Sequence, residues 1–113
     1  MSQTVSSLQT KLKPIGTALA GVVTNTYHYW RPVSTTPYLI WAEDGGNEYQ
    51  ADNKNAAQAI TGTADYYTKS EFDVNVDAIQ TAFDTLGLAW HLNSVMYEDE
   101  TNLIHYSWDW EAL

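Results

Sequence analysis

Three histidines and fourteen acidic side chains are the residues that could support metal or acid–base chemistry. The histidines are His28, His91 and His105. No two of them are two or four residues apart, the spacings that bring two imidazoles to one ion on a strand or a helix. The sequence therefore predicts no metal site, and these side chains are expected to be ordinary hydrogen-bonded or surface histidines.

Paired carboxylates occur at Glu98-Asp99-Glu100 and at Asp109 with Glu111. Such pairs serve glycosidases and calcium sites. Asp109 and Glu111 would share one face of a strand, whereas the first group falls in an expected turn, where acids are solvated. The chain has no nucleophile motif, no phosphate-binding glycine loop, no HExxH string and no cysteine. We therefore expect a non-enzymatic protein without a cofactor, with a small metal-dependent hydrolase as the weakest alternative.

Tryptophan is the one compositional excess, with five residues in 113. Trp108 and Trp110 lie on the apolar face of the last expected strand and are predicted to be core residues. Trp30, with Tyr27 and Tyr29, lies in an extended segment before a proline-containing linker and is predicted to form a protein interface, because Tyr and Trp are enriched there. Exposed tryptophans can also stack on sugar rings. A carbohydrate-binding or adhesion module is therefore the alternative function.

The first half of the chain is expected to be one helix followed mainly by strands. Apolar residues at three and four spacing predict a helix over residues 5–13, ended by Pro14 at a cost of about 3 kcal/mol. Gly16 and Gly21 then disfavour helix, and residues 22–31 are expected to be extended. Strands are predicted over 38–42, 48–51 and 57–69, the last interrupted by Gly62. Asp44-Gly45-Gly46-Asn47 is the expected turn between the first two of these strands.

The second half is expected to be a helix and a hairpin. Apolar residues recur at three and four after a cap at Asp73 or Asn75, and Gly87 ends the helix. Asp77 and Asp84 lie on another face and are expected to be solvated. Alternating residues over 88–92, 95–98 and 104–110 predict a two-stranded hairpin around a turn at 98–102. The result is one domain, residues 1–113, of the α+β class: a mainly antiparallel sheet packed with two helices in the order α-β-β-β-α-β-β.

Charge and hydropathy argue against nucleic-acid-binding and membrane proteins. The chain has 14 acidic and 5 basic residues and a formal charge of −9, and the basic residues are scattered. Binding to DNA or RNA through phosphates needs clustered Lys and Arg. No apolar run reaches the roughly 20 residues of a bilayer span, and the N-terminal residues lack signal-peptide features. We therefore expect no direct grip on nucleic acid and no membrane contact. An acidic face that lets DNA pass without adhering is the functional reading of the charge.

Three motifs in order resemble a known family. They are Thr36-Pro37-Tyr38-Leu39-Ile40-Trp41, then Tyr49-Gln50-Ala51-Asp52-Asn53-Lys54, then Asp65-Tyr66-Tyr67-Thr68-Lys69 before an acidic helix. Over roughly residues 8–111 the chain resembles small tail-completion proteins of phages and prophages of Gram-positive bacteria. These are similar to the tail terminators of long-tailed phages.

The resemblance implies a structural role in virion assembly. Tail terminators have an α+β fold and form hexameric rings at the head-proximal end of the tail tube, where they stop tube polymerisation and meet the connector. The implied partners are further copies of this chain, the tail tube protein and a head-completion or connector protein. The implied location is the head–tail junction of a virion assembled in the host cytoplasm. The interface candidates, by position, are Tyr27, Tyr29, Trp30, Arg31, Tyr49, Asp52 and Lys54.

Overall fold

The computed structural model describes residues 3–32, 35–49 and 57–113, with the backbone alone for residues 3–7, 47–49 and 57–58. The elements, in order, are α1 (Gln3–Val22), β1 (Thr26–His28), β2 (Tyr38–Tyr49), β3 (Ala57–Thr68), α2 (Val74–Thr85), β4 (Ala89–Glu98) and β5 (Leu103–Ala112). The predicted α+β class and the order α-β-β-β-α-β-β are confirmed. The molecule is elongated, with extents of 50 × 23 × 23 Å.

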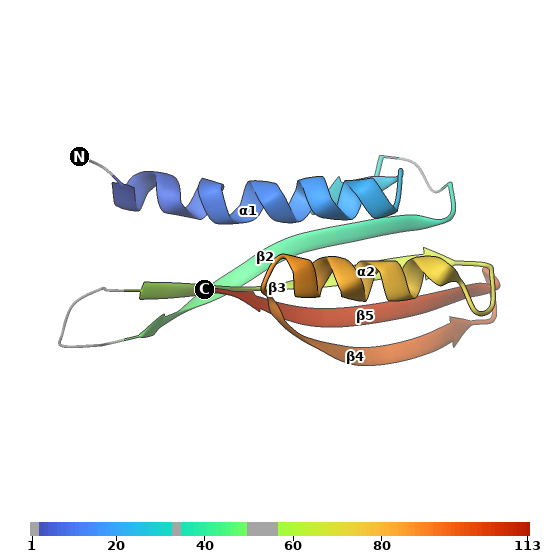
Figure 1. Cartoon of the computed structure of the whole chain (residues 1–113). Helices are drawn as coiled ribbons and strands as arrows, with labels where there is room; N and C mark the ends of the chain where they lie inside the picture. The colour runs from blue at the N-terminus through green and yellow to red at the C-terminus, as the bar shows by residue number, and fades with distance from the viewer. Residues whose placement is uncertain (1–2, 33–34, 50–56) are drawn as a thin grey trace.

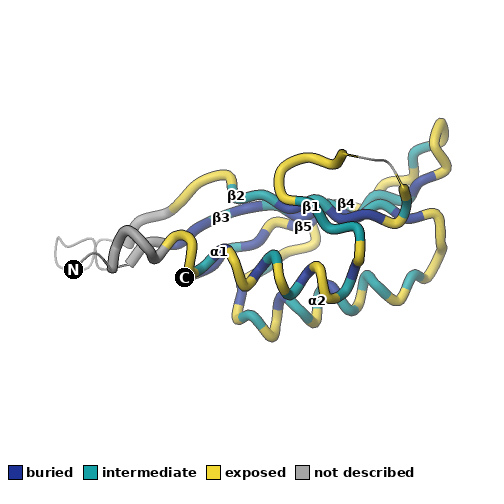
Figure 2. Tube along the Cα trace, turned by 90° about the horizontal axis from the view of Figure 1, so that it is seen from above, coloured by how far each residue is buried: buried dark blue, intermediate teal, exposed yellow. Residues whose placement is uncertain are grey.

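The five strands form one sheet in the order β1-β2-β3-β5-β4. β1 is parallel to β2, and the other neighbours are antiparallel. Both helices lie on the same side of this sheet (Figures 1 and 2). We call that side the covered face and the opposite side the open face.

The core lies between the helices and the covered face. From α1 and the turn after it, Leu12, Ile15, Leu19 and Val23 are buried, and α2 contributes Ile79 and Phe83. The sheet contributes the remaining large side chains, of which the best enclosed are Leu39, Tyr66 and Trp108. Each such apolar side chain stabilises the fold by about 1.5–3 kcal/mol. The prediction that Trp108 and Trp110 are core residues is confirmed, with exposed fractions of 0% and 2%.

Helix α1 continues through Pro14, so its predicted end near residue 13 and the extended segment from residue 22 were wrong. Pro14 is exposed, and the apolar stripe continues past it to Ile15 and Leu19, which are 1% and 0% exposed. Their burial offsets the lost hydrogen bond of the proline. Gly16 fits the helix because it lies against Trp41; a Cβ there would be 2.8 Å from the indole ring. Only residues 26–28 of the expected extended segment form a strand.

Strand β2 runs through Asp44-Gly45-Gly46-Asn47, so the predicted turn there was wrong. The predicted return strand over 48–51 was wrong too, because residues 48 and 49 continue β2 and residues 50–51 lie outside the described part. The register shifts between Glu43 and Gly45, which accommodates Asp44 as a bulge residue instead of reversing the chain. Opposite the bulge, β3 passes Gly62 without the predicted interruption.

The second half agrees with its prediction, and its helix is anchored at Asp73. That carboxylate accepts hydrogen bonds from the Asn75 backbone N–H (2.9 Å) and from the Tyr66 and Thr68 hydroxyls (both 2.7 Å). The same side chain therefore caps α2 and joins it to β3. Gly87 follows the helix with φ of +76°, a conformation that favours glycine. The hairpin of β4 and β5 follows.

Gly62→Ala tests the close contact between β3 and β5. A Cβ at Gly62 would be 2.1 Å from the Trp110 ring and 2.5 Å from the Ala42 carbonyl oxygen, so the backbone must move. We expect a loss of about 3 kcal/mol in the free energy of unfolding, measured by denaturant titration. The control is Gly21→Ala in α1, where a Cβ meets nothing within 4 Å and we expect a gain of about 0.5–1 kcal/mol. Equal effects of the two substitutions would contradict this packing.

Asp73→Ala tests the link between α2 and β3. It removes three hydrogen bonds to a carboxylate, and we expect a loss of about 2–4 kcal/mol. Asp77→Ala, in the exposed first turn of the same helix, is the control and should cost less than about 0.5 kcal/mol. Partial burial alone would raise the pKa of Asp73, but the hydrogen bonds from Tyr66, Thr68 and Asn75 hold it below its ordinary value. The difference between wild type and Asp73→Ala should therefore be full at neutral pH and shrink as acidification protonates Asp73.

Candidate interaction surfaces

The open face of the sheet is polar and acidic, because alternation sends its apolar neighbours to the covered face. On β3 and β5 the buried Ala64, Tyr66 and Trp108 point to the helices. The intervening positions pair across the strands on the open face: Thr61 with Glu111, Thr63 with Asp109, Asp65 with Ser107, and Tyr67 with His105. Both helices lie on the other side of the sheet (Figure 2), so no helix lies over these positions.

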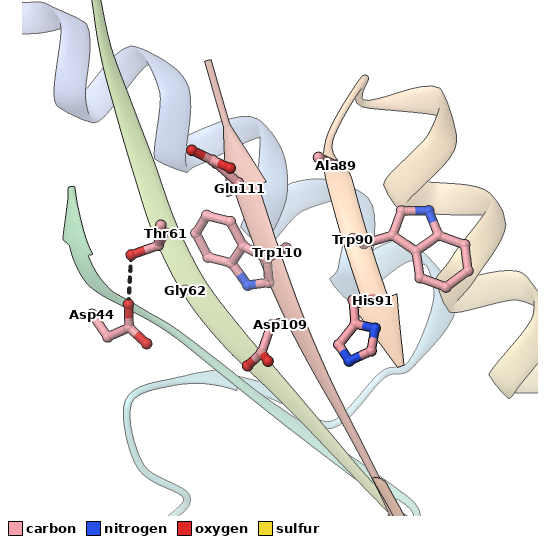
Figure 3. A pocket seen from close by; sticks show the side chains of 9 residues that line it. All are labelled: Asp44, Thr61, Gly62, Ala89, Trp90, His91, Asp109, Trp110 and Glu111. Carbon is pink, nitrogen blue, oxygen red and sulfur yellow. Dashed lines mark hydrogen bonds between the residues drawn. The ribbon is translucent and has the colours of Figure 1, made fainter. Parts of the chain in front are cut away.

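At one end of the open face is a hollow that we call the acidic hollow (Figure 3). Its polar lining residues are Asp44, Thr61, His91, Asp109 and Glu111, and Gly62, Ala89, Trp90 and Trp110 complete it. The Thr61 hydroxyl donates to the Asp44 carboxylate at 2.8 Å. Within the part of the chain that the structure describes, no group of three or more His, Asp or Glu side chains could hold a metal ion. The hollow brings the carboxylates of Asp44, Asp109 and Glu111 to one part of the surface, and clustered carboxylates repel phosphate.

Towards the other end, aromatic rings form a row across three strands, which we call the tyrosine row. Tyr67 stacks between Tyr38, at 4.7 Å between ring centroids, and His105, at 4.1 Å. The Arg31 guanidinium lies 4.9 Å from the centroid of the Tyr38 ring. His105 Nε2 is 2.8 Å from the Asp65 carboxylate. Burial, with the Asp65 charge second, raises the pKa of Tyr67 to about 12.

A third cluster lies where β1 meets β2. The His28 ring stacks between Tyr29 and Trp41, at 4.0 Å from each, and its Nε2 is 2.7 Å from Glu43 Oε1. The Tyr29 hydroxyl donates to the other oxygen of Glu43, and the Tyr29 N–H donates to the Trp41 carbonyl at 2.9 Å. Partial burial alone would raise the pKa of Glu43, but the hydrogen bonds from Tyr29 and His28 lower it. These contacts hold Tyr29 at φ of +79°, and Trp30 follows it, 68% exposed.

The interface candidates are divided between two places. Tyr27 is half-buried on β1, and Tyr29, Trp30 and Arg31 follow it on one exposed loop. Tyr49 ends β2, eight residues beyond Trp41 and about 27 Å from it along the strand. Asp52 and Lys54 lie outside the described residues. An interface role for all seven stays a prediction.

Sequence reasoning missed two exposed apolar groups. Strand β4 exposes Leu92 (38%), Val95 (50%), Met96 (58%) and Tyr97 (59%). Phe72, just before α2, is 91% exposed and has φ of +56°, an unusual conformation for a bulky residue. The alternating pattern predicted the strand, but its place at the edge of the sheet depends on pairing between distant segments. The absence of charge over residues 92–97 was the available signal.

Comparison with known proteins finds a similar fold among solved structures. No family model matches the chain, and no curated protein matches its sequence. A chain in the solved structure of the virion of a native gene transfer agent particle is similar over 93% of this chain and 89% of that chain. The TM-score is 0.55 and the sequence identity is 13%. The two chains share a fold. No helix in the described part of this chain is long and apolar enough to cross a membrane.

Alkaline titration tests the tyrosine row. Tyr66 and Tyr67 both have pKa values raised to about 12, so absorbance at the phenolate band should show a late step there. Because their ordinary value is 10, the protein should lose stability as the pH rises from 10 towards 12. Tyr67→Phe should reduce the late step. Asp65→Asn should lower the pKa of Tyr67, whereas Asp109→Asn removes the same charge from the open face beside Thr63 and should lower it less. Equal shifts from the two Asn variants would contradict the described geometry.

Proposed function

We propose that this chain is a structural virion protein, a tail terminator or tail-completion component at the head–tail junction. The observation that carries the proposal is the fold shared over most of both chains with a chain of a gene transfer agent virion. The order of motifs that resembles phage tail-completion proteins supports the same role independently. In this role the protein caps the tail tube and joins it to the capsid connector, as a ring of identical copies, with six expected from the resemblance.

The geometry suits a ring around DNA. The helices cover one face of the sheet and leave the other face to carboxylates, among them Asp44, Asp109 and Glu111. If the open face lines the channel, DNA passes a surface of its own sign and does not adhere. Six copies with a formal charge of −9 each carry about −54 in total. The partners in this proposal are other copies of the chain, the tail tube protein and a head-completion or connector protein.

A carbohydrate-binding platform receives less support from the tryptophans. All five belong to the described residues, and Trp30 is the one with a largely exposed ring. Trp41, Trp108 and Trp110 are buried, and Trp90 is half-buried against Phe83 with its indole N–H donating to Asp84 at 2.8 Å. A sugar platform needs neighbouring exposed rings, and the tryptophans do not provide them.

Disruption of the gene in its phage tests the role. A terminator-deficient phage should make filled capsids and tubes of irregular length that fail to join, as seen by electron microscopy of lysates. Expression of the wild-type chain from a plasmid should restore virions, and the same plasmid with an early stop codon should not. Normal yields of virions with tails of normal length, made without this protein, would contradict the proposed function.

A further inference from the structure

The sheet has two free edges at opposite ends. Among the strands that the structure describes, β4 pairs with β5 alone, and β1 pairs with β2 alone. The outer side of β4, an edge strand of ten residues, presents unpaired N–H and C=O groups. Proteins usually protect such an edge with Lys or other charged residues, or with Pro. Residues 92–97 of β4 contain none of these. The edge is therefore open to a further strand.

Apolar side chains on β4 are uncovered in a single copy. Leu92 pairs with Trp108, Val95 with Tyr106 and Tyr97 with Ile104, so all three point to the covered face. Helix α2 reaches β4 at Trp90, through Phe83 at 5.9 Å between ring centroids. Past Trp90 the three side chains stay 38–59% exposed. The helix layer ends before the sheet does.

The opposite edge carries aromatic residues held in place. Tyr29 is 55% exposed and Trp30 68% exposed, and they follow β1 directly. Glu43 and His28 hold Tyr29 in place before any contact forms, and such preordering lowers the entropic cost of association. Residues 24–30, like residues 92–97, carry no Asp, Glu, Lys or Arg.

We propose, on the basis of the function proposed above, that β4 of one copy adds to β1 of a second copy. The same chain supplies both edges, at opposite ends of one sheet, so the contact is head-to-tail and closes into a ring when the rotation permits. In a chain of net charge −9, two copies repel least where the pairing segments contain no acidic residues, as in residues 24–30 and 92–97. Tyr and Trp beside β1 then meet the uncovered apolar side chains of β4, a composition typical of interface hot spots.

The topology also gives the direction of the contact. β1 and β2 are parallel and the next three pairings are antiparallel, so β4 runs opposite to β1. Rotation about the ring axis leaves the strand directions unchanged from one copy to the next. The pairing of β4 of one copy with β1 of the next is therefore antiparallel. Across the sheet, Thr26 pairs with Leu39, Leu39 with Tyr66, Tyr66 with Tyr106, and Tyr106 with Val95. Thr26 and Val95 therefore lie at the same level of the sheet. Without stagger, Val95 of one copy faces Thr26 of the next.

Disulfide trapping tests the contact in a chain that has no native cysteine. Thr24→Cys, an exposed position just before β1, is combined in turn with Val95→Cys, Met96→Cys and Tyr97→Cys. Oxidation of the assembled protein should give a ladder of covalent oligomers on non-reducing gels for at least one pair. Each single variant should give no ladder, because a head-to-tail contact needs both edges. Thr24→Cys with Thr81→Cys, on the exposed face of α2, is the matched control and should give none.

The outcomes separate this contact from the proposed function. Covalent dimers from a β4 cysteine alone would show a two-fold pairing of β4 with itself and overturn the head-to-tail contact. Absence of ladders from all three double variants, while the wild type forms rings by native mass spectrometry, would overturn the contact and leave the function standing. A wild type that forms no ring even with tail tube protein present would overturn both.

Discussion

Both helices pack on one face of a five-stranded sheet, and the other properties of the molecule depend on this one-sided burial. Trp108, Tyr66 and Phe83 are fully enclosed between the two layers. On β3 and β5 the buried Ala64, Tyr66, Trp108 and Trp110 turn that way, and the alternate positions carry mostly Thr, Ser, His, Asp and Glu. The open face is therefore acidic as a consequence of the core, and the two helices are too narrow a layer to cover the outer half of β4.

The three interaction surfaces follow from the same arrangement. The acidic hollow and the tyrosine row occupy the face without helices, and the exposed apolar side chains of β4 lie where the helix layer stops. At the other edge, Glu43 joins His28 and Tyr29 and so orients the loop that carries Trp30. A subunit with one acidic face, and with edge segments 24–30 and 92–97 that contain no Asp, Glu, Lys or Arg, suits an assembly in which edges meet neighbours and the face meets DNA.

The sequence predicted correctly those elements that are set by residues close to one another along the chain. The α2 cap at Asp73, the stop at Gly87 and the C-terminal hairpin were foreseen because caps, glycines and alternation act within a few residues. Pro14 and Asp44-Gly45-Gly46-Asn47 misled the prediction, since tertiary contacts decided both: burial of Ile15 and Leu19 carries α1 past the proline, and pairing with β3 keeps β2 extended. Trp30, predicted to be an interface residue, is exposed, but the segment that carries it was predicted to be extended and is a loop. The exposed edge at Val95 and Met96 was not foreseen, because strand order is set by distant pairings.

We propose that this chain forms a ring whose open sheet face lines the channel. Cryo-electron microscopy of the head–tail junction tests it most directly, because the density shows which layer of each subunit meets the lumen. The account predicts a ring with Asp109 and Glu111 facing the channel and both helices on the outside. A junction that contains the protein with its helices facing the lumen, or one that lacks the protein, would contradict it.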